Sequence, residues 1–386
     1  MAVPFLDQDG PYCQCSLSLH DTIADPDIEF DDRGVSIYHY YYEEAKQRHN
    51  SLGACTREQL NGVAEDMVRA GRGRSYDCLI GLSGGVDSAY AALTAKQLGL
   101  RPLAVHLDNG WNSEIAVKNI ENIVNRLGID LYTHVIDWEE FRDLQLAYLR
   151  ASVVDIEVLT DHAILAILFR QAVERKVKYI INGCNVQTEN ILPWSWVHPK
   201  GDHVNIRAIH KAYSKVPLKT FPLLDFKLKS YGDRFKPVKH LPILNYLDYN
   251  KEEVKSQITE QLGWCDYGGK HYESVWTRFY QGYILPKKFR IDKRKSHLSS
   301  LIFDGQLTKE AAQRELETPI YDPTQFNLDY DFVLKKLELT QSQFEEIMRQ
   351  PRRSHYEFDY EMPLAQRYPI LKPVKKLYRS LFPQKK

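Results

Sequence analysis

The fold is decided by the stretch Ser83-Gly84-Gly85-Val86-Asp87-Ser88. It follows the short apolar run from Asp77 to Leu82, which predicts a buried strand, and it opens a predicted helix from Asp87 to about Leu98. A glycine turn between a strand and a helix can present backbone N–H groups and the helix N-terminus to a phosphate group. We therefore expect an anion-binding turn at this point of the chain.

Each residue type in the turn suits that chemistry. Glycine lets the backbone approach the anion and adopt positive φ, and serine hydroxyls add donors. The carboxylate can cap the helix or help to hold Mg²⁺, which makes it a catalytic candidate. The Walker pattern GxxxxGK[ST] is absent, so the turn has no lysine for a γ-phosphate. The nucleotide-binding residues predicted here are Ser83, Gly84, Gly85, Val86, Asp87 and Ser88.

The turn resembles the PP-loop, SGGxDS, of the ATP pyrophosphatase superfamily. This resemblance implies that ATP is held by its β and γ phosphates and cleaved at the α phosphorus, which leaves pyrophosphate and an adenylated substrate. The alternative is a glycine turn that only joins a strand to a helix.

Strands and helices alternate on both sides of this turn. Helices are predicted at about Tyr40–Gln47 and Thr56–Ala70, then near 114–127, 138–150 and 161–174. Further strands are predicted at 103–107, 131–135 and 179–182. Strands separated by helices of this length indicate an α/β fold with a doubly wound parallel sheet, of the adenine nucleotide alpha-hydrolase-like kind in view of the PP-loop resemblance.

The alternation fades after about Leu192. One helix is predicted near 250–262, Thr308 opens another, and residues 350–386 are expected to be extended and wrapping, or partly free. We divide the chain into an N-terminal extension (1–70), a PP-loop domain (71–265) and a mainly helical substrate or partner region (266–386).

Two further loops are expected beside the turn, because ligands of open parallel sheets bind at the carboxyl ends of the strands. The superfamily resemblance assigns the backbone after the second strand to adenine, although an ordinary turn would also suit Asp108. Cys184, after the fourth strand, is a nucleophile candidate or, preferably, a small buried residue. The nucleotide-binding residues assigned to these loops are His106, Leu107, Asp108, Gly183, Asn185 and Glu189.

Composition limits the remaining function classes. Lys plus Arg and Asp plus Glu both number 51, and this balance argues against a general nucleic-acid binder. Six scattered cysteines indicate reduced thiols rather than a disulfide framework. The first residues do not form a signal peptide and no membrane-length apolar stretch is present, so a soluble cytoplasmic protein is expected.

Most of the chain, from about Asp25 to about Glu315, resembles the N-acetyl sugar amidotransferase (WbpG-type) family of bacterial lipopolysaccharide and O-antigen synthesis. The segments that carry the resemblance are the turn itself and residues 25–28, 160–164, 183–189, 268–274, 280–286 and 289–302. It implies that the N-acetyl group of a nucleotide sugar becomes an acetamidine, with ATP consumed in its activation and Mg²⁺ as a cofactor. It also implies an ammonia-supplying glutaminase subunit like those of the histidine pathway, and a cyclase-like protein that completes the complex.

Several polar residues are candidates for the substrate side of the reaction. Asp161 and His162 start a helix behind the crevice, where His162 can move a proton or serve as a structural histidine. The basic run 287–295 could hold a sugar diphosphate or form a solvated helix face. Trp194 and Trp196 could stack on a ring or pack in the core. The substrate-binding residues predicted here are Lys270, His271, Glu273, Lys293 and Arg294.

Members of this family often carry two CxxC pairs at the N-terminus, a plausible zinc site. Here the cysteines of the first pair are one residue too close, and Ser36 and His39 stand at the second. The residues left for Zn²⁺ are Cys13, Cys15, His20 and His39. A lost site, with this region held by packing, is the preferred interpretation.

Three other functions compete with the sugar amidotransferase. A tRNA thiolase usually needs a basic surface or a catalytic cysteine pair, and an amide ligase would share the PP-loop chemistry. A non-catalytic subunit would keep ATP only to hold a complex together. ATP consumption separates the last of these from the enzymes.

Overall fold

The computed structural model describes residues 11–51, 56–185, 192–230, 238–268 and 272–362. Within these ranges five strands form one parallel sheet in the order β3-β2-β1-β4-β5. The strands are β1 (Cys78–Gly81), β2 (Pro102–Asp108), β3 (Asp130–Val135), β4 (Tyr179–Asn182) and β5 (Lys239–Pro242). The predicted doubly wound parallel sheet is therefore confirmed, and β5 is an addition that the sequence did not reveal.

The strands have a hydrophobic side chain on each face because successive residues of a strand point to opposite sides. Leu79 belongs to one large core and its neighbour Ile80 to the other. Ile80 pairs with Ala104 on one side and with Ile181 on the other, and all three side chains share that second core. Burial on both faces explains why these strands are apolar without alternation.

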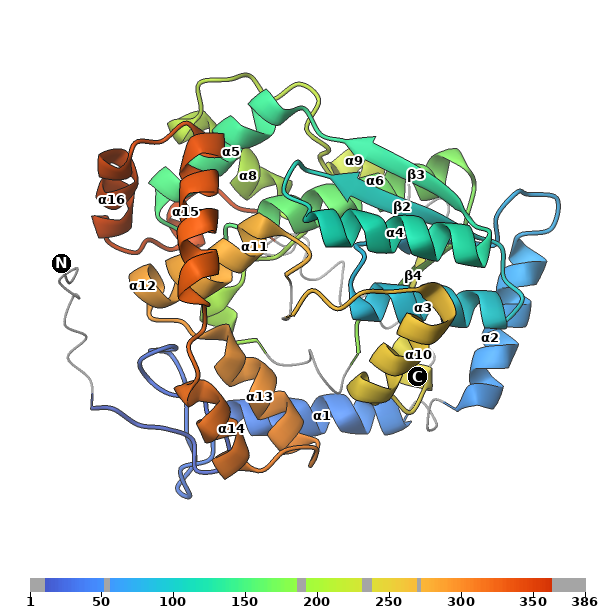
Figure 1. Cartoon of the computed structure of the whole chain (residues 1–386), viewed down its shortest axis with the longest axis horizontal. Helices are drawn as coiled ribbons and strands as arrows, with labels where there is room; N and C mark the ends of the chain where they lie inside the picture. Colours follow the sequence, from blue (N-terminus) through green and yellow to red (C-terminus); the bar gives the residue numbers. More distant parts are fainter. Residues whose placement is uncertain (1–10, 52–55, 186–191, 231–237, 269–271, 363–386) are drawn as a thin grey trace, which may run out of the picture.

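Helices cover both faces of the sheet (Figure 1). One face carries α2 (Arg57–Ala70), α3 (Val86–Gln97), α4 (Glu114–Leu127) and α10 (Lys251–Leu262). The other carries α5 (Trp138–Ala151) and α6 (Val158–Glu174). These helices confirm the predicted ones to within a few residues, and α1 (Ile37–Ser51) is longer at both ends than expected.

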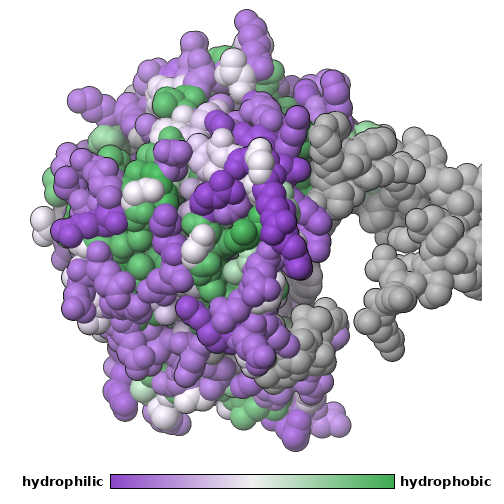
Figure 2. Space-filling model, turned by 90° about the vertical axis from the view of Figure 1, so that its right-hand side faces the viewer, coloured by the Kyte–Doolittle hydropathy of each residue, from purple (hydrophilic) through white to green (hydrophobic). Residues whose placement is uncertain are grey.

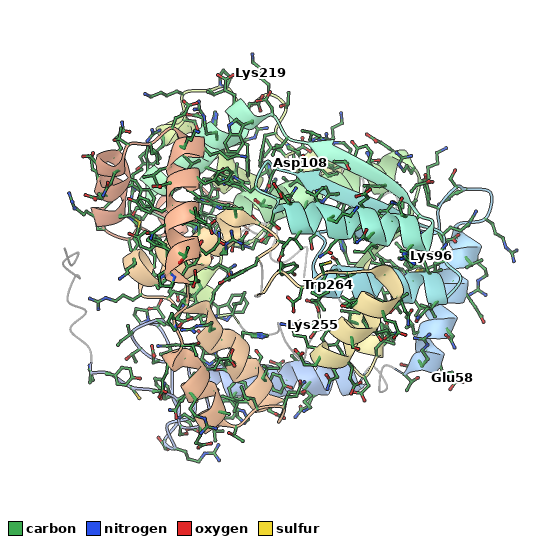
Figure 3. All side chains as sticks on the ribbon, in the orientation of Figure 1. Glu58, Lys96, Asp108, Lys219, Lys255 and Trp264 are labelled. Atoms are coloured by element: carbon green, nitrogen blue, oxygen red, sulfur yellow. The ribbon has the colours of Figure 1, made fainter. Side chains whose placement is uncertain are left out.

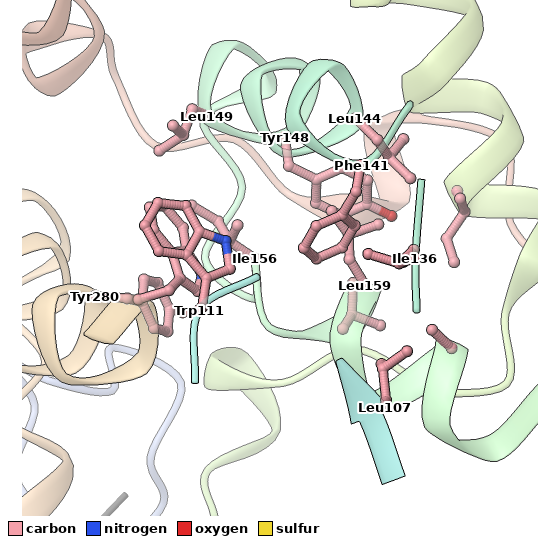
Figure 4. Packing of buried hydrophobic residues seen from close by; sticks show 14 of the residues in the cluster. Leu107, Trp111, Ile136, Phe141, Leu144, Tyr148, Leu149, Ile156, Leu159 and Tyr280 are labelled. Atoms are coloured by element: carbon pink, nitrogen blue, oxygen red, sulfur yellow. The ribbon is translucent and has the colours of Figure 1, made fainter. Parts of the chain in front are cut away.

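The C-terminal helices extend the core on the α5–α6 side. Trp276 of α11 (Val275–Phe279), Tyr280 of the π-helical turn η4 (Tyr280–Ile284) and Leu285 of α12 (Leu285–Phe289) are buried in it. The Tyr280 hydroxyl donates a hydrogen bond to the Val154 carbonyl oxygen. Figure 4 labels Tyr280 and Trp111 among the residues of this core, and the Trp276 ring packs against both of them. Two more helices close this side, α15 (Pro323–Leu337) and α16 (Gln341–Arg349).

The N-terminal segment packs against α13 (Lys293–Phe303) and α14 (Lys309–Glu317) at the lower edge of Figure 1. Leu19 shares a small core with Leu298 of α13, and the Tyr42 hydroxyl of α1 donates to Asp304 at 2.6 Å. Segments from opposite ends of the sequence thus form one layer. The three-part division of the chain stays a prediction.

The described part of the tail, up to Met362, wraps over α8 (His203–Tyr213). Asn205 Nδ2 donates to the carbonyl oxygens of His355 at 2.9 Å and Asp359 at 3.2 Å. Short elements complete the chain: α9 (Phe226–Ser230), η1 (Trp194–Trp196), η3 (Ile243–Tyr246) and η5 (His355–Glu357). No helix in the described ranges combines the length and the apolar character needed to cross a membrane, and the face drawn in Figure 2 is mostly hydrophilic.

Candidate nucleotide site

The Ser83–Ser88 turn lies where the winding of the sheet reverses. The chain moves from β1 outward to β2 and β3, then returns to place β4 on the other side of β1. The loops that follow β1 and β4 therefore leave the sheet in opposite directions and open a crevice at its carboxyl edge, which is the usual ligand position in such sheets. The sequence placed its three candidate loops at this edge, and the strand order brings them there.

The turn is ordered by its two serines. Ser83 Oγ lies 3.2 Å from Ser88 Oγ and accepts a hydrogen bond from the Gly85 N–H at 3.3 Å. Ser88 Oγ donates to the Gly85 carbonyl oxygen at 3.0 Å. Gly85 is the N-cap residue of α3 and supplies no side-chain cap. The positive end of the α3 dipole therefore lies at this turn without a side-chain cap from Gly85, as an anion site requires.

Gly84 must be glycine for two reasons. Its φ is +81°, in the left-handed region, and a Cβ atom on it would lie 2.6 Å from the Ala116 carbonyl oxygen of α4. The turn is thus pressed directly against the start of α4. The loop after β4 also lies close to a neighbouring element, because a Cβ on Gly183 would lie 2.9 Å from the Asp87 carbonyl carbon of α3.

Two side chains that sequence reasoning missed hold the Gly84 carbonyl oxygen. Trp264 Nε1 donates to it at 2.9 Å and Asn119 Nδ2 at 3.4 Å. Trp264 follows α10, and Figure 3 labels it together with Asp108 at the end of β2. Asn119 also exchanges two hydrogen bonds with the backbone of Cys265, at 2.8 and 2.9 Å. These contacts fix the direction of the peptide group in the middle of the turn.

Asp87 stands in the first turn of α3 rather than at its cap. The Tyr249 hydroxyl donates to Asp87 Oδ1, a contact that the sequence did not suggest. The carboxylate and the nearby serine hydroxyls are hard oxygen donors of the kind that Mg²⁺ prefers. Asp87 therefore fits a role as magnesium ligand, with phosphate oxygens and water completing the shell.

The loop after β2 is held by His106. Its Nδ1 lies 2.9 Å from the Leu82 carbonyl oxygen, which can only accept, so Nδ1 carries the proton and Nε2 accepts from Asn112 Nδ2 at 3.2 Å. Burial lowers the pKa of His106 and favours this neutral form. Asp108 Oδ1 accepts from the Gly110 N–H at 2.9 Å, and the Leu107 side chain lies in the core. The part of Leu107 that is left to contact a nucleotide is therefore its backbone.

The loop after β4 differs from expectation in one residue. Cys184 is exposed, which corrects the preferred interpretation of a small buried residue. Its N–H donates to Asn182 Oδ1 at 3.1 Å, a local turn that keeps the side chain outside. Asn185 is buried, and Glu189 lies outside the described residues.

His162 is fixed by the backbone on both sides of its ring. Its Nδ1 donates to the Lys200 carbonyl oxygen at 2.8 Å, and its Nε2 accepts from the Leu224 N–H at 2.9 Å. Burial lowers its pKa to about 4. A proton could enter or leave only by breaking one of these bonds, so the geometry favours the structural interpretation of His162 over proton transfer.

Charged groups gather at the start of α6. Lys200 Nζ lies 3.0 Å from Asp161 and 2.7 Å from Asp155. Glu157, the N-cap residue, meets Lys293 Nζ at 3.2 Å and Gln281 Nε2 at 2.9 Å. The loop after β2 reaches this end of the helix as well, because Asn109 Nδ2 donates to Thr160 Oγ1 at 3.3 Å. Lys293 and Asp161 are thus both members of ion pairs at this end of α6.

Most of the basic run has internal partners. Arg294 Nη2 lies 2.9 Å from Asp292 Oδ2, and Arg294 Nη1 donates to the Thr318 carbonyl oxygen at 2.9 Å. Since Thr318 follows α14, these two contacts give Arg294 a structural role. Lys288 donates to backbone carbonyls at the end of α16, and Lys295 pairs with Asp21. These pairings fit neither a diphosphate site nor a solvated helix face.

Glu273 is brought to the turn by pairing between distant loops. Its carbonyl oxygen accepts from the Ser113 N–H at 2.8 Å, and the next residue bridges to Asn112. Its Oε1 lies 3.9 Å from the place that a Cβ on Gly85 would take. Of the other predicted substrate residues, Lys270 and His271 lie outside the described residues.

The two tryptophans after β4 differ in exposure. Trp196 is buried, and its Nε1 donates to the Ala24 carbonyl oxygen at 2.7 Å, so it packs in the core. Trp194 is 75% exposed and can meet a ligand or a partner.

The four predicted zinc residues do not form a metal centre. Among the described residues no three His, Cys, Asp or Glu side chains gather around a common point suited to a metal ion. Cys13 is exposed, whereas Cys15 is buried and accepts from the Ser36 N–H at 3.2 Å. Although burial opposes the thiolate, hydrogen bonds from Ser18 and Ser36 lower the pKa of Cys15. The side-chain hydrogen-bond partners of the Cys15 sulfur are therefore serines and not further metal-ligating side chains.

Comparison with protein families gives one match, which begins at the residue that reaches the turn. Residues 273–372 match the model described as "LPS biosynthesis protein WbpG-like, C-terminal domain". The chain carries a WbpG-like C-terminal domain. Over residues 273–372, this match confirms the WbpG-type resemblance stated from the sequence, and it includes the last two segments of that resemblance, 280–286 and 289–302. With the SGGxDS sequence of the Ser83–Ser88 turn, it indicates an ATP-using enzyme of the ligase or amidotransferase type.

Solved structures resemble the chain only remotely. NMN synthetase from Francisella tularensis is 16% identical, with 73% of this chain and 94% of that chain covered and a TM-score of 0.33. An NH3-dependent NAD synthetase from Campylobacter jejuni, in complex with nitrate, is 15% identical over 53% and 91%, with a TM-score of 0.30. A predicted tRNA methyltransferase subunit from Methanocaldococcus jannaschii is 11% identical over 47% and 75%, with a TM-score of 0.27. No curated protein sequence matches the chain. Scores this low carry no functional information, so the fold assignment rests on the strand order itself.

Proposed function

We propose that this protein uses ATP to convert the N-acetyl group of a nucleotide sugar into an acetamidine, for the synthesis of a surface polysaccharide. The observation that supports this most directly is the meeting of the phosphate-binding turn with the first residue of the WbpG-like domain. Gly85 and Glu273 belong to these two parts and come within a few ångströms of each other. ATP and the sugar would therefore meet at one place.

The chemistry needs ATP because an amide is a poor electrophile. Resonance strengthens its C–N bond and quenches its carbonyl carbon, and the same resonance gives peptides a rotation barrier of about 18–20 kcal/mol. Attack of the amide oxygen on the α phosphorus forms an O–P bond and breaks the bond to pyrophosphate. The product is an O-adenylated imidate. Ammonia then adds to its carbon, the C–O bond breaks, and AMP leaves with the former amide oxygen while one proton is released.

The chain's own groups have distinct tasks in this scheme. The α3 N-terminus and the serines of the turn hold the β and γ phosphates, and Asp87 would hold the Mg²⁺ that neutralises them. The loop after β2, held in place by His106, offers its backbone to the adenine. Paired charges at Glu157 and Asp161 line the side from which sugar hydroxyls can be bound.

Ammonia must reach the imidate unprotonated and shielded from water. The described residues show no glutaminase site, and the expectation of a separate glutaminase subunit, like those of the histidine pathway, is part of this proposal. A cyclase-like third protein belongs to the same expectation. The exposed Trp194 is a surface on which a sugar, a base or such a partner could rest.

The test is product analysis by mass spectrometry after incubation with ATP, magnesium, ammonium and a panel of UDP-N-acetyl sugars. AMP, pyrophosphate and a sugar about one mass unit lighter, from replacement of oxygen by NH, are the expected products. Asp87→Asn should slow their formation about 100-fold, whereas Asp66→Asn, a surface change in α2 beside Arg69, should not. Formation of ADP and phosphate would refute adenylation. Absence of a lighter sugar even with a glutaminase added would refute the assigned substrate.

A further inference from the structure

One phosphate-binding group of the turn already has a partner from another part of the chain. Tyr267 lies just after α10, and its hydroxyl oxygen is 3.2 Å from the place that a Cβ on Gly85 would take. Glu273 Oε1 lies 3.9 Å from the same place, so the hydroxyl and this carboxylate both lie beside Gly85, the N-cap residue of α3. A neutral oxygen therefore covers the helix end where a phosphate oxygen is expected.

The Tyr267 side chain is held in place by packing against Trp264. Its ring packs edge-on against Trp264, with centroids 5.6 Å apart and planes at 72°. Trp264 in turn donates to the Gly84 carbonyl oxygen. The Trp264–Tyr267 pair thus contacts the turn at two neighbouring residues, Gly84 through its carbonyl oxygen and Gly85 beside its Cα atom.

We propose that the Tyr267 hydroxyl competes with the β and γ phosphates of ATP for the N-terminus of α3, so that the triphosphate binds only by displacing it. This inference rests on the proposed function, because it takes the turn to be the phosphate site. A phosphate oxygen placed at this helix end must push the hydroxyl aside and must also approach the Glu273 carboxylate.

The competition makes a specific prediction about ligands. Ligands with a diphosphate or triphosphate group must displace the hydroxyl from this helix end, whereas AMP, which lacks the β and γ phosphates, leaves it in place. Tyr267 is thus a residue that tunes affinity for the pyrophosphate part of ATP alone. It would also lower the affinity for released pyrophosphate, which helps that product to leave.

The experiment is calorimetric titration of the full-length protein, in magnesium, with α,β-methylene ATP, pyrophosphate and AMP. Tyr267→Phe keeps the ring on Trp264 and removes only the hydroxyl. It should bind α,β-methylene ATP and pyrophosphate about 3- to 10-fold more tightly, the ratio expected for one net hydrogen bond, and AMP with unchanged affinity. Tyr272→Phe is the matched control, because the Tyr272 hydroxyl donates to the Ile320 carbonyl oxygen at 3.4 Å instead of to the turn.

The outcomes separate this inference from the function on which it rests. If the wild-type protein binds α,β-methylene ATP and Tyr267→Phe binds it equally or more weakly, the competition is refuted and the nucleotide site stands. An equal gain for AMP, or the same gain in Tyr272→Phe, would refute it too, since the effect would not be specific to the phosphates or to this hydroxyl. If the wild-type protein binds none of the three ligands, the proposed function falls and the inference falls with it.

Discussion

Substitution of Gly84 by alanine tests the geometry of the turn most directly. The new methyl group would meet two separate costs, the left-handed φ of +81° and the Ala116 carbonyl oxygen 2.6 Å away. A left-handed residue with a Cβ costs about 1–2 kcal/mol, and the restriction of the unfolded chain returns about 0.4–1 kcal/mol. Overpacking against a backbone atom adds about 1–3 kcal/mol. Gly84→Ala should therefore lower the free energy of unfolding by about 2–4 kcal/mol.

Two other glycines separate these costs. Gly99 also has positive φ, +74°, but a Cβ there meets nothing within 4 Å, so Gly99→Ala carries the backbone cost alone, about 1 kcal/mol. Gly183 lacks positive φ, and its Cβ would meet Asp87 at 2.9 Å, so Gly183→Ala carries the steric cost alone, about 1–2 kcal/mol. Both sites flank the same sheet, which makes the comparison internal to one fold.

The assay is equilibrium unfolding in urea, followed by far-ultraviolet circular dichroism, with titration of α,β-methylene ATP on the folded variants. Gly84→Ala should be the least stable of the three and should lose nucleotide binding, whereas Gly99→Ala should keep it. If Gly84→Ala proves no less stable than Gly99→Ala, the close approach of the turn to α4 is wrong. Retained nucleotide affinity in Gly84→Ala would refute the role of the turn as the phosphate site.

Three further substitutions probe single contacts. Because burial lowers the pKa of His162 to about 4 from its usual 6.5, the unfolded chain takes up a proton at this residue first as pH falls, and stability is lost between pH 6.5 and about 4. The variant His162→Gln cannot titrate and can still accept from Leu224, so its free energy of unfolding should depend less on pH in that window. Equal slopes for the variant and the wild-type protein would contradict this. Trp264→Phe removes the donor to Gly84, so urea unfolding should show a loss of about 1–2 kcal/mol and ATP kinetics a raised KM, and unchanged values would argue against the contact. Asp87→Asn should lower kcat about 100-fold while unfolding stays within about 1 kcal/mol, and a kcat near that of wild type would exclude Asp87 as a magnesium ligand.

The parts of the fold that the sequence predicted are those with strong local signals. Helix α4 has the predicted bounds because its apolar stripe, its Ser113 cap and Gly128 at its end agree. β5 was missed because Lys239–Pro242 contains a lysine, a histidine and a proline, and it acquires its structure by pairing with β4. The segment from α11 to α12 was missed because a π-helical turn interrupts the 3.6-residue period.

Some missed elements did carry a readable signal. Asp322 followed by Pro323 opens α15, and Thr340 with Gln343 forms a capping box at α16. Asn119 is a polar residue on the otherwise apolar face of α4, and a buried polar group on such a face indicates a partner elsewhere in the chain. The partner itself, the segment at Cys265, comes from 146 residues away, and only the packed structure reveals it.

The geometry of the Ser83–Ser88 turn therefore depends on more than its own six residues. A trans peptide group is planar, so the Gly84 carbonyl and the Gly85 N–H point in opposite directions. Holding the carbonyl with Trp264, 180 residues away, fixes where the N–H points before any ligand arrives. Such preorganisation spares the ligand the cost of ordering the loop, and it explains why the short motif that reveals the chemistry cannot by itself create the site. The segment that supplies Trp264 ends where the WbpG-like match begins, at Glu273, so the support of the turn and the matched segment are continuous along the chain.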